Sequence, residues 1–362
     1  MLRKFPRKIK RVVVKLGSSV IATYQMKPRV AQLRSLVEQV TAVRSKGIDV
    51  VLVSSGAIVL GMGELSKKFR PGDLASLQAI SAVGQTILMR KYNQLFKSCK
   101  AKCAQLLLTW DDFDNRVRYN NARNTFNAMF DMGIVPVVNE NDTISTDEIK
   151  FGDNDKLSAL VASLIGADLL LILSDVEGLY DLNSGQKRVF DEIKEITREI
   201  EGIAGGTTKK QMSKGGMSAK LAAVKIASHA KIPCVIAHGE SEDVLLRVIK
   251  GERIGTLFVE KEDKLLARKH WISFGAKPKG ELIVDDGARK ALLKGGNSLL
   301  LVGVHKWQGH FKKGDVVVVK DMEKHEIARG IINYAITDLN ETGEKKGREE
   351  VIHVDDLVLS ER

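Results

Sequence analysis

The chain has 362 residues, of which 44% are hydrophobic and 28% are charged, and it contains only 6 prolines. This composition excludes a mainly disordered chain, and at roughly 150 residues per domain the length predicts two domains. The formal net charge is +12, and its excess lies in residues 1–37, with ten Lys or Arg, and in residues 202–239, with six Lys; neither stretch holds an acid. Such charge fits a polyanionic partner, but solvated basic faces would account for it equally.

Short apolar runs alternate with longer helical patterns through residue 250. The runs are apolar almost throughout, which is typical of strands buried on both faces in a mainly parallel sheet. The sequence therefore predicts an α/β domain in which helices sandwich a mainly parallel sheet, with ligands bound beyond the carboxyl ends of the strands. The predicted strands are Val12–Leu16, Val50–Ser54, Ala104–Leu108, Val135–Val138, Leu169–Leu173 and Pro233–Ala237. The predicted helices are Arg29–Ser45, Leu74–Phe96, Ala122–Met132, Asp155–Ile165 and Met217–Ala230.

The pattern changes near residues 274–280, where glycine, proline and lysine indicate a linker. Short strand-like runs follow, interrupted by one helical stretch at Gly287–Lys294, and they predict a small, mostly β domain. We therefore expect one domain over residues 1–270 and a second over residues 277–362. The strands expected in the second domain are Glu281–Val284, Ser298–Val302, Val316–Val319, Ile327–Tyr334 and Val351–Val354.

The cysteines, the histidines and the apolar runs exclude several classes of protein. The three cysteines form neither a disulfide framework nor a zinc site, and the seven histidines show no H-E-x-x-H spacing, so we assign no metal-ligating residue. The longest run without a charge, Leu74–Met89, is shorter than the roughly 20 residues that span a membrane. We expect a cytoplasmic protein without a membrane partner.

Two polar motifs follow the first two predicted strands. Lys15 lies at the end of an apolar run and is followed by Gly17; a buried lysine is costly unless an anion meets it, although its side chain can also reach the surface. The second motif, Ser54-Ser55-Gly56, suits the binding of an anion by backbone N–H groups, and it is equally a common helix cap.

Two further motifs are rich in carboxylates and carboxamides. Asn139–Asp142 directly follows a predicted strand, and Gly152–Asp155 opens a predicted helix. An amino-acid substrate needs carboxylates for its ammonium group and N–H donors for its carboxylate, which these residues would supply. An ordinary turn and a helix N-cap remain the alternatives.

A glycine pair, Gly215-Gly216, precedes a predicted helix that carries Lys220 in its first turn. Glycines allow close approach of backbone N–H groups to a phosphate, while the helix dipole and the lysine add positive charge. The stretch does not match the P-loop pattern, so a nucleotide site here would be of another kind. A flexible loop before a solvated lysine is the alternative.

Taken together in chain order, these motifs resemble the amino acid kinase family from residue 11 to about residue 260. Residues 280–288 look like the start of a PUA domain, a small β module found in RNA-modifying enzymes. The Asn-Glu-Asn-Asp and Gly-Asp-Asn-Asp loops, with this tail, narrow the match to members that phosphorylate L-glutamate. The motifs that carry the resemblance are Val13–Gly17, Ser55–Ala57, Asn139–Asp142, Gly152–Asp155, Ser174–Tyr180 and Gly215–Lys220.

The resemblance implies the amino acid kinase fold and the ATP-dependent phosphorylation of the side-chain carboxylate of L-glutamate to L-glutamyl 5-phosphate, the first step of proline biosynthesis. ATP with Mg²⁺ would be the phosphoryl donor. The same resemblance suggests a homo-oligomer formed through the kinase domain, feedback inhibition by proline, and functional coupling to a glutamyl-phosphate reductase. No general base is needed, because the glutamate side chain, with a reference pKa of about 4.3, is already ionised.

The resemblance also implies roles for individual residues. Lys15 and Lys220 would stabilise the transferring phosphoryl group, and Asp155 would hold the two lysines in place. Lys214 stands where many relatives have a small Thr or Ser, so either its side chain or only its backbone would contact ATP. The residues implied for glutamate binding are Ser55, Asp142, Asp153 and Asn154. Those implied for ATP binding are Lys15, Ser174, Asp175, Lys214, Gly215, Gly216, Met217, Ser218, Ala219 and Lys220.

Two alternatives stay open on the sequence. The chain could be another amino acid kinase, acting on N-acetylglutamate, aspartate or UMP, although Asp142 favours a substrate with a free ammonium group. It could instead act chiefly as an RNA-binding protein through the PUA-like domain. Residues 277–362 hold 15 basic and 15 acidic residues and are neutral, which argues against a strong RNA footprint there.

Overall fold

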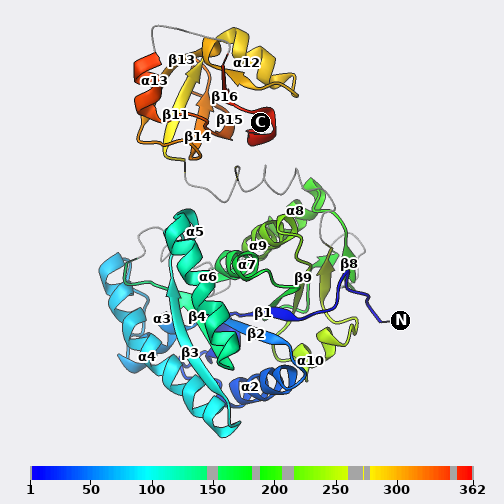
Figure 1. Cartoon of the computed structure of the whole chain (residues 1–362). Helices are drawn as coiled ribbons and strands as arrows, with labels where there is room; N and C mark the ends of the chain where they lie inside the picture. Colours follow the sequence, from blue (N-terminus) through cyan, green and yellow to red (C-terminus); the bar gives the residue numbers. More distant parts are fainter. Residues whose placement is uncertain are drawn as a thin grey trace. The chain divides into compact units, whose positions relative to one another are not determined.

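The computed structural model describes residues 2–144, 154–181, 188–205, 216–259, 272, 278–342 and 349–360. The chain forms two compact units, Met1–Lys261 and Glu262–Arg362. The boundary expected between residues 270 and 277 lies among residues 260–277, of which only Ile272 is described. Figure 1 shows both units.

The first unit is built on an eight-stranded sheet with the strand order β3-β4-β2-β1-β5-β9-β10-β8. The strands from β3 to β9 in this order are all parallel, and β10 is antiparallel to β9. The strands are β1 (Arg11–Leu16), β2 (Asp49–Ser54), β3 (Lys102–Leu108), β4 (Ile134–Glu140), β5 (Leu169–Ser174), β8 (Glu192–Ile193), β9 (Cys234–His238) and β10 (Thr256–Phe258), with a separate ribbon of β6 (Tyr180–Asp181) and β7 (Arg188–Val189). The prediction of a mainly parallel sheet is confirmed.

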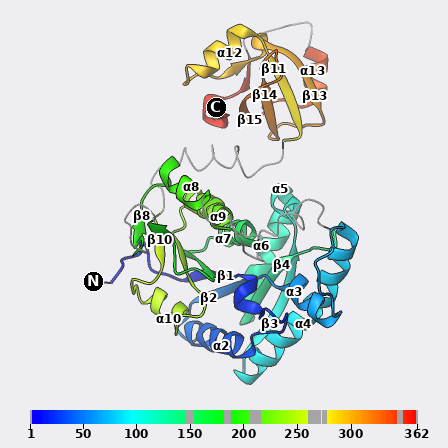
Figure 2. The ribbon, with the colours of Figure 1, turned by 180° about the vertical axis from the view of Figure 1, so that it is seen from behind.

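Helices cover both faces of this sheet. The helices are α1 (Ser18–Ile21), α2 (Val30–Arg44), α3 (Ala57–Glu64), α4 (Leu74–Ser98), α5 (Asp111–Asp114), α6 (Arg116–Asp131), α7 (Asn154–Ile165), α8 (Arg198–Gly205), α9 (Met217–His229) and α10 (Val244–Ile249). In Figures 1 and 2 the helices α6, α7 and α9 lie on one side of the sheet, and α2 and α10 lie on the other.

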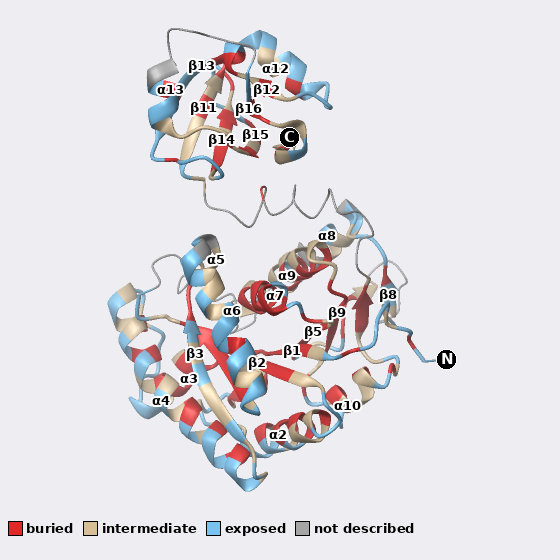
Figure 3. Cartoon of the chain, viewed as in Figure 1, coloured by how far each residue is buried: buried red, intermediate tan, exposed pale blue. Residues whose placement is uncertain are grey.

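Alternate residues of the central strands enter two separate cores. Val12, Val14 and Leu16 of β1 pack with residues of α2, α4 and α10, whereas Val13 packs with residues of α6, α7 and α9. Side chains of a strand point alternately to the two faces, so a strand covered on both faces is apolar at nearly every position. Figure 3 shows the result: the central strands and most of α7 are buried, whereas α2 and α4 have one buried side and one exposed side.

One helix begins earlier than its apolar pattern predicts. The helix expected at Ala122–Met132 starts at Arg116, because the side chain of Asn115 accepts hydrogen bonds from the N–H groups of Val117 and Arg118. This N-cap satisfies two of the N–H groups that a helix start otherwise leaves without partners. Among the described residues, no helix is long and apolar enough to cross a membrane.

The basic N-terminal segment is tied into the sheet by its arginines. The guanidinium of Arg3 donates to the carbonyl oxygens of Ile254 and Gly255, at 2.6 Å each, and to Asp191 at 2.7 Å. Arg11 donates at 2.6 Å to the carbonyl oxygen of Ile165, at the end of α7, and lies 4.4 Å from the centre of the Phe130 ring. Hydrogen bonds from arginine to backbone carbonyl oxygens at the end of a helix or in a loop stabilise the fold.

Helices α3 and α4 cross at two glycines. A Cβ atom at Gly84 would fall well inside van der Waals distance of the carbonyl oxygen of Ala57, and one at Gly61 would do the same with the carbonyl oxygen of Ile80. The backbones of α3 and α4 are therefore closer than they could be if either glycine carried a side chain. This contact fixes where α4 lies along α3.

The second unit contains a five-stranded sheet with the order β13-β11-β14-β15-β17 and a two-stranded sheet of β12 and β16. Its elements are β11 (Gly280–Val284), α12 (Asp286–Leu293), β12 (Leu299–Leu300), β13 (Val304–Gly309), β14 (Val316–Lys320), β15 (Glu326–Ile331), α13 (Ile336–Thr342), β16 (Glu350–Ile352) and β17 (Leu357–Leu359). The expected mostly β character is confirmed. Strand β13 was not predicted, because an edge strand with exposed His305, Lys306 and Gln308 shows little apolar periodicity.

The glycine crossing predicts a strong effect of one methyl group. We expect Gly84→Ala to lower the free energy of unfolding by about 3 kcal/mol or more, because overpacking against a backbone oxygen forces the two helices apart. Gly72→Ala is the matched control, since a Cβ atom there meets nothing within 4 Å. Denaturant unfolding of both variants measures the difference, and equal stabilities would refute the close contact.

Candidate active site

Polar side chains lie at the carboxyl ends of four neighbouring strands. Strand β1 ends just after Lys15, β2 ends at Ser54, β4 at Glu140 and β5 at Ser174. These strands are parallel and consecutive in the order β4-β2-β1-β5, so their carboxyl ends lie at one edge of the sheet. Ligands of open α/β sheets bind at this edge. The topology thus brings together motifs that are far apart in the sequence.

At this edge the carboxylate of Asp155 lies between two lysines. Lys15 forms an ion pair with Oδ1 of Asp155, and Nζ of Lys220 lies 3.3 Å from Oδ2. The relative exposure is 1% for Asp155 and 5% for each lysine. The three residues come from the first strand and from the starts of α7 and α9, so the tertiary structure alone assembles them.

The charges of this cluster determine the protonation of Asp155. Burial by itself would raise the pKa of the carboxyl group, but the ammonium groups of Lys15 and Lys220 outweigh burial and lower the pKa below its ordinary value. Asp155 is therefore ionised at neutral pH. With both lysines as ammonium ions, the cluster carries one net positive charge, which suits it to an anionic ligand.

A network of carboxamides lies beside the cluster. The side-chain Nδ2 of Asn154 donates to Oδ1 of Asn139 at 2.9 Å and to Oγ of Ser55 at 3.1 Å. Asn139 in turn donates through Nδ2 to Oε1 of Gln85 at 2.7 Å. The hydrogen bond from the N–H of Ser55 to the carbonyl oxygen of Leu16, at 3.1 Å, ties this network to the end of β1.

The turn after Ser55 requires a glycine. Gly56 has a φ of +100°, in the left-handed region, and a Cβ atom there would lie 2.7 Å from Cγ2 of Ile21. Helix α3 begins directly after this turn, at Ala57. The sequence Ser-Ser-Gly therefore does more than cap a helix, since it places the Ser55 hydroxyl against Asn154.

Asp142 is a second carboxyl group at the same edge, and it is partly buried. The hydroxyl of Ser81 on α4 donates to its Oδ2. Burial raises the pKa of Asp142, and the hydrogen bond from Ser81 and the nearby charge of Arg70 counteract this rise only in part. Asp142 therefore differs from Asp155, whose two lysines reverse the effect of burial.

Helix α4 contributes three residues that the sequence analysis did not assign to a site. Ser81 contacts Asp142, Gln85 accepts from Asn139, and the Tyr92 hydroxyl lies 2.9 Å from Oγ of Ser54. Their spacing of four and seven residues puts them on one face of a helix. That spacing is visible in the sequence, but the long apolar pattern of the helix is also that of an ordinary core helix.

The residues expected to bind a nucleotide lie at the ends of β5 and the start of α9. Ser174 is buried and donates at 2.9 Å to Oδ1 of the exposed Asp175. Gly216 is the N-cap of α9, and Met217, Ser218 and Ala219 form its first turn with Lys220. Asp153, Lys214 and Gly215 lie outside the described residues, so their roles stay predictions.

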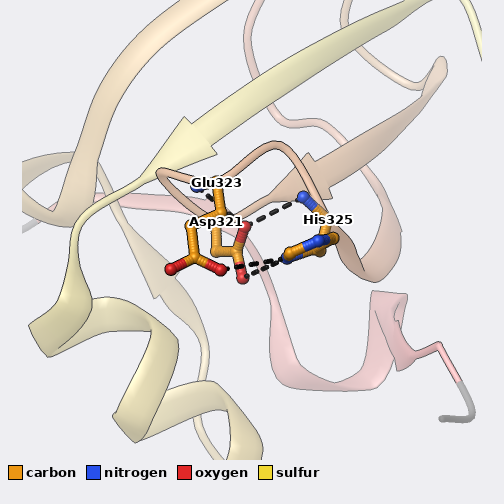
Figure 4. A group of neighbouring side chains, drawn as sticks. All are labelled: Asp321, Glu323 and His325. Carbon is orange, nitrogen blue, oxygen red and sulfur yellow. Dashed lines mark hydrogen bonds and ion pairs between the residues drawn. The ribbon is translucent and has the colours of Figure 1, made fainter.

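Within the described ranges, the group of ligand-type side chains suited to a metal ion lies in the second unit, and it comprises Asp321, Glu323 and His325 (Figure 4). Oδ1 of Asp321 accepts from the N–H groups of Glu323 and His325, at 3.1 and 2.9 Å. The guanidinium of Arg289 lies 3.4 Å from its other oxygen. The carboxylate of Asp321 therefore already has a cationic partner in Arg289. Its backbone hydrogen bonds close the turn between β14 and β15.

Comparison with known proteins agrees with both units. Residues 10–238 match the Amino acid kinase family, and residues 280–354 match the PUA domain. The chain is 45% identical to the glutamate 5-kinase of Dictyoglomus turgidum, with 98% of each chain covered. It is 43% identical to that of Citrifermentans bemidjiense, with 99% of this chain and 100% of the relative covered. The solved UMP kinase of Bacillus anthracis covers 70% of this chain and 98% of its own, with 16% identity and a TM-score of 0.48.

The carboxyl groups of Asp155 and Asp142 predict opposite effects of the same substitution. Asp155→Asn should lower the free energy of unfolding at neutral pH by about 3 kcal/mol, because two buried lysines lose their counter-charge. Asp142→Asn should leave stability unchanged or raise it, because burial makes the ionised carboxyl group of Asp142 less favourable in the folded state than in the unfolded chain.

Denaturant unfolding without ligands measures both effects. The deficit of Asp155→Asn should shrink as the pH falls through the lowered pKa of Asp155, because the stability that an ionised Asp155 contributes is lost there. If the two variants lost the same stability at neutral pH, the opposite pKa shifts assigned to Asp155 and Asp142 would be wrong.

Proposed function

This chain belongs to the amino acid kinase family, and from this we propose that it transfers the γ-phosphoryl group of ATP to the side-chain carboxylate of L-glutamate. The product is L-glutamyl 5-phosphate, and the reaction is the first step of proline biosynthesis. Residues 1–270 would carry the reaction, with the PUA domain appended over residues 277–362. The observation that carries the proposal is the carboxylate of Asp155 between two buried lysines, beside a network of carboxamides.

The reaction joins two anions that repel each other. One oxygen of the glutamate side-chain carboxylate attacks the γ-phosphorus of ATP, the bond to the bridging oxygen breaks, and ADP leaves with its electron pair. No proton needs to be removed, because the attacking carboxylate is ionised at neutral pH. Catalysis therefore consists of alignment and of positive charge at the transferring group.

Lys15 and Lys220 are the residues suited to supply that charge. Both are buried, so their charges act at low dielectric, where electrostatic stabilisation is strongest. Asp155 sets their direction, because each of its oxygens faces one lysine. We assign Lys15 and Lys220 to the transferring phosphoryl group, and Asp155 to the positioning of both lysines.

The amino acid would bind beside the cluster of Lys15, Asp155 and Lys220, on the side of the carboxamide network. The Ser55 hydroxyl and the Asn154 carboxamide lie together at the end of β2, and Asp142 offers a carboxylate to the ammonium group. Oδ1 of Asn154 is buried and has no hydrogen-bond partner among the residues that the structure describes, as expected for an acceptor that a substrate completes. Asp153 is proposed as a neighbour of this site from the sequence alone.

The nucleotide would bind between the end of β5 and the start of α9. Ser174, Asp175 and the stretch Gly216–Lys220 are the described residues proposed for ATP, with Lys214 and Gly215 added from the sequence. The N–H groups in the first turn of α9 offer donors to phosphate oxygens. The phosphates would then lie next to Lys220.

Mg²⁺ would accompany ATP, mainly on the phosphates and water. The oxygens of Asp155 do not fit a metal ion, since a lysine faces each of them, whereas the exposed carboxylate of Asp175 at the end of β5 does. When bound, the ion neutralises charge on the β- and γ-phosphate oxygens.

Further properties follow as proposals from the same assignment. We propose association of the kinase domains into a homo-oligomer, inhibition by proline near the glutamate site, and transfer of the labile acyl phosphate to a glutamyl-phosphate reductase. A cytoplasmic location agrees with Cys99, Cys103 and Cys234, which are all free thiols.

The test of the function is ATP turnover with four acceptors in parallel: L-glutamate, N-acetylglutamate, L-aspartate and UMP. Hydroxylamine traps an acyl phosphate as a hydroxamate, and we expect this product with L-glutamate alone. A free ammonium group is what Asp142 would recognise, so the acetylated substrate should fail. Turnover with another acceptor and none with L-glutamate would contradict the proposal. An RNA-binding assay on the full chain tests the alternative role of the PUA domain.

The raised pKa of Asp142 predicts a pH dependence of glutamate binding. As the pH falls through this pKa, the carboxylate takes up a proton and loses its attraction for the substrate ammonium group, so the KM for L-glutamate should rise. The KM for ATP should change little over the same range. In Asp142→Asn the KM for L-glutamate should be high at every pH, and a variant with the wild-type profile would exclude Asp142 as the titrating group.

A further inference from the structure

Two backbone groups determine the direction of the carboxamide network. The N–H of Glu140 donates at 2.9 Å to the side chain of Asn139, so the atom that receives it is the oxygen Oδ1. The carbonyl oxygen of Ser54, 3.3 Å from Asn154, can only accept, so Asn154 turns its Nδ2 toward it. No amide of the network can be reversed without placing two acceptors or two donors together.

The network therefore has two different ends. Asn154 donates to Asn139, and Asn139 donates to Oε1 of Gln85, which leaves Oδ1 of Asn154 at one end and Nε2 of Gln85 at the other. Both atoms are buried, and neither has a hydrogen-bond partner among the described residues. One end is an acceptor and the other is a donor, which is the pair that a zwitterionic amino acid needs for its ammonium and its carboxylate.

The strand order indicates which of the two carboxylates of the substrate would meet the donor Nε2 of Gln85. Asn139 lies on β4, which is separated from β1 and its Lys15 by β2. Neighbouring strands are about 4.8 Å apart, so Asn139 is about 10 Å from the strand that carries Lys15. The reacting side-chain carboxylate has to lie at Lys15. The α-carbon end of the substrate then points toward β4, and its α-carboxylate lies toward Gln85.

We propose that Gln85 is a substrate-binding residue, and that its Nε2 donates a hydrogen bond to the α-carboxylate of the bound amino acid. This inference rests on the proposed function and extends it to the recognition of the substrate's α-carbon end. Gln85 also orients Asn139, whose Nδ2 donates to it, and through Asn139 it orients Asn154.

Gln85 is in a rigid part of the fold. Its neighbour Gly84 packs against the carbonyl oxygen of Ala57 in α3, and Leu88, one turn further along α4, is fully buried. Ser81, one turn earlier, contacts Asp142. The helix thus presents Gln85 at a fixed place, and its amide loses little conformational freedom on binding.

The substitution Gln85→Glu separates the two roles of this side chain. A carboxylate still accepts the hydrogen bond from Asn139, but it replaces the donor with a negative charge that repels the substrate α-carboxylate. We expect the KM for L-glutamate to rise about 10- to 100-fold, with the KM for ATP within about twofold of wild type. Gln85→Met, which keeps the shape and loses both hydrogen bonds, should also raise the KM for L-glutamate.

The control is Gln94→Glu, which adds the same charge on the exposed side of α4. A second measurement uses 4-aminobutyrate, which lacks the α-carboxylate, as a competitor of L-glutamate. Its inhibition constant should be no weaker in Gln85→Glu than in wild type, because the group that the variant repels is missing. Thermal unfolding of each variant shows that the changes in KM occur in folded protein.

The possible outcomes separate this inference from the function. A KM for L-glutamate in Gln85→Glu within twofold of wild type, or a rise equal to that of Gln94→Glu, would overturn the role of Gln85 alone. An equal loss of binding for 4-aminobutyrate and L-glutamate would show that Gln85 acts only on the fold. A wild-type enzyme without glutamate-dependent turnover would overturn the proposed function, and this inference with it, before any variant is measured.

Discussion

The ion pairs of Asp155 are the interaction on which the rest of the site depends. Two lysines buried to 95% are unfavourable unless an anion compensates them, and a carboxylate buried to 99% is unfavourable without cations. The three groups satisfy one another and retain one positive charge for a ligand. They also connect β1, α7 and α9, so the sheet edge and the starts of α7 and α9 are held in one arrangement.

Helix α4 imposes the second constraint. Its close crossing with α3 fixes its position. One face of it then hydrogen-bonds to the ends of β2 and β4 and to Asp142 after β4, through Tyr92, Gln85 and Ser81 respectively. The polar residues at the ends of β2 and β4 and just after β4 have short side chains, which would have several rotamers on their own. A rigid helix that hydrogen-bonds to each of them selects one, as a preorganised binding site requires.

Several basic residues of the chain bind groups within the fold, which the net charge alone does not show. Ten Lys or Arg in residues 1–37 would fit a polyanion, yet Arg3 and Arg11 donate to backbone carbonyl oxygens and carboxylates of the fold. Lys15, at the end of β1, is the basic residue of this segment that the fold places beside Asp155. Position in the topology, more than net charge, therefore decides which cations lie at the carboxyl edge of the sheet.

The sequence by itself determined the class of fold and the polar motifs, because strands buried on both faces are apolar at nearly every position and the motifs follow directly after them. It also placed Lys15, Asp155 and Lys220 in one site, but only through resemblance to a family. The tertiary structure decided which of these groups meet, how Asp142 and Asp155 differ in pKa, and that Gln85 hydrogen-bonds to Asn139. These properties depend on burial and on distances between residues far apart in the chain, which no local pattern contains.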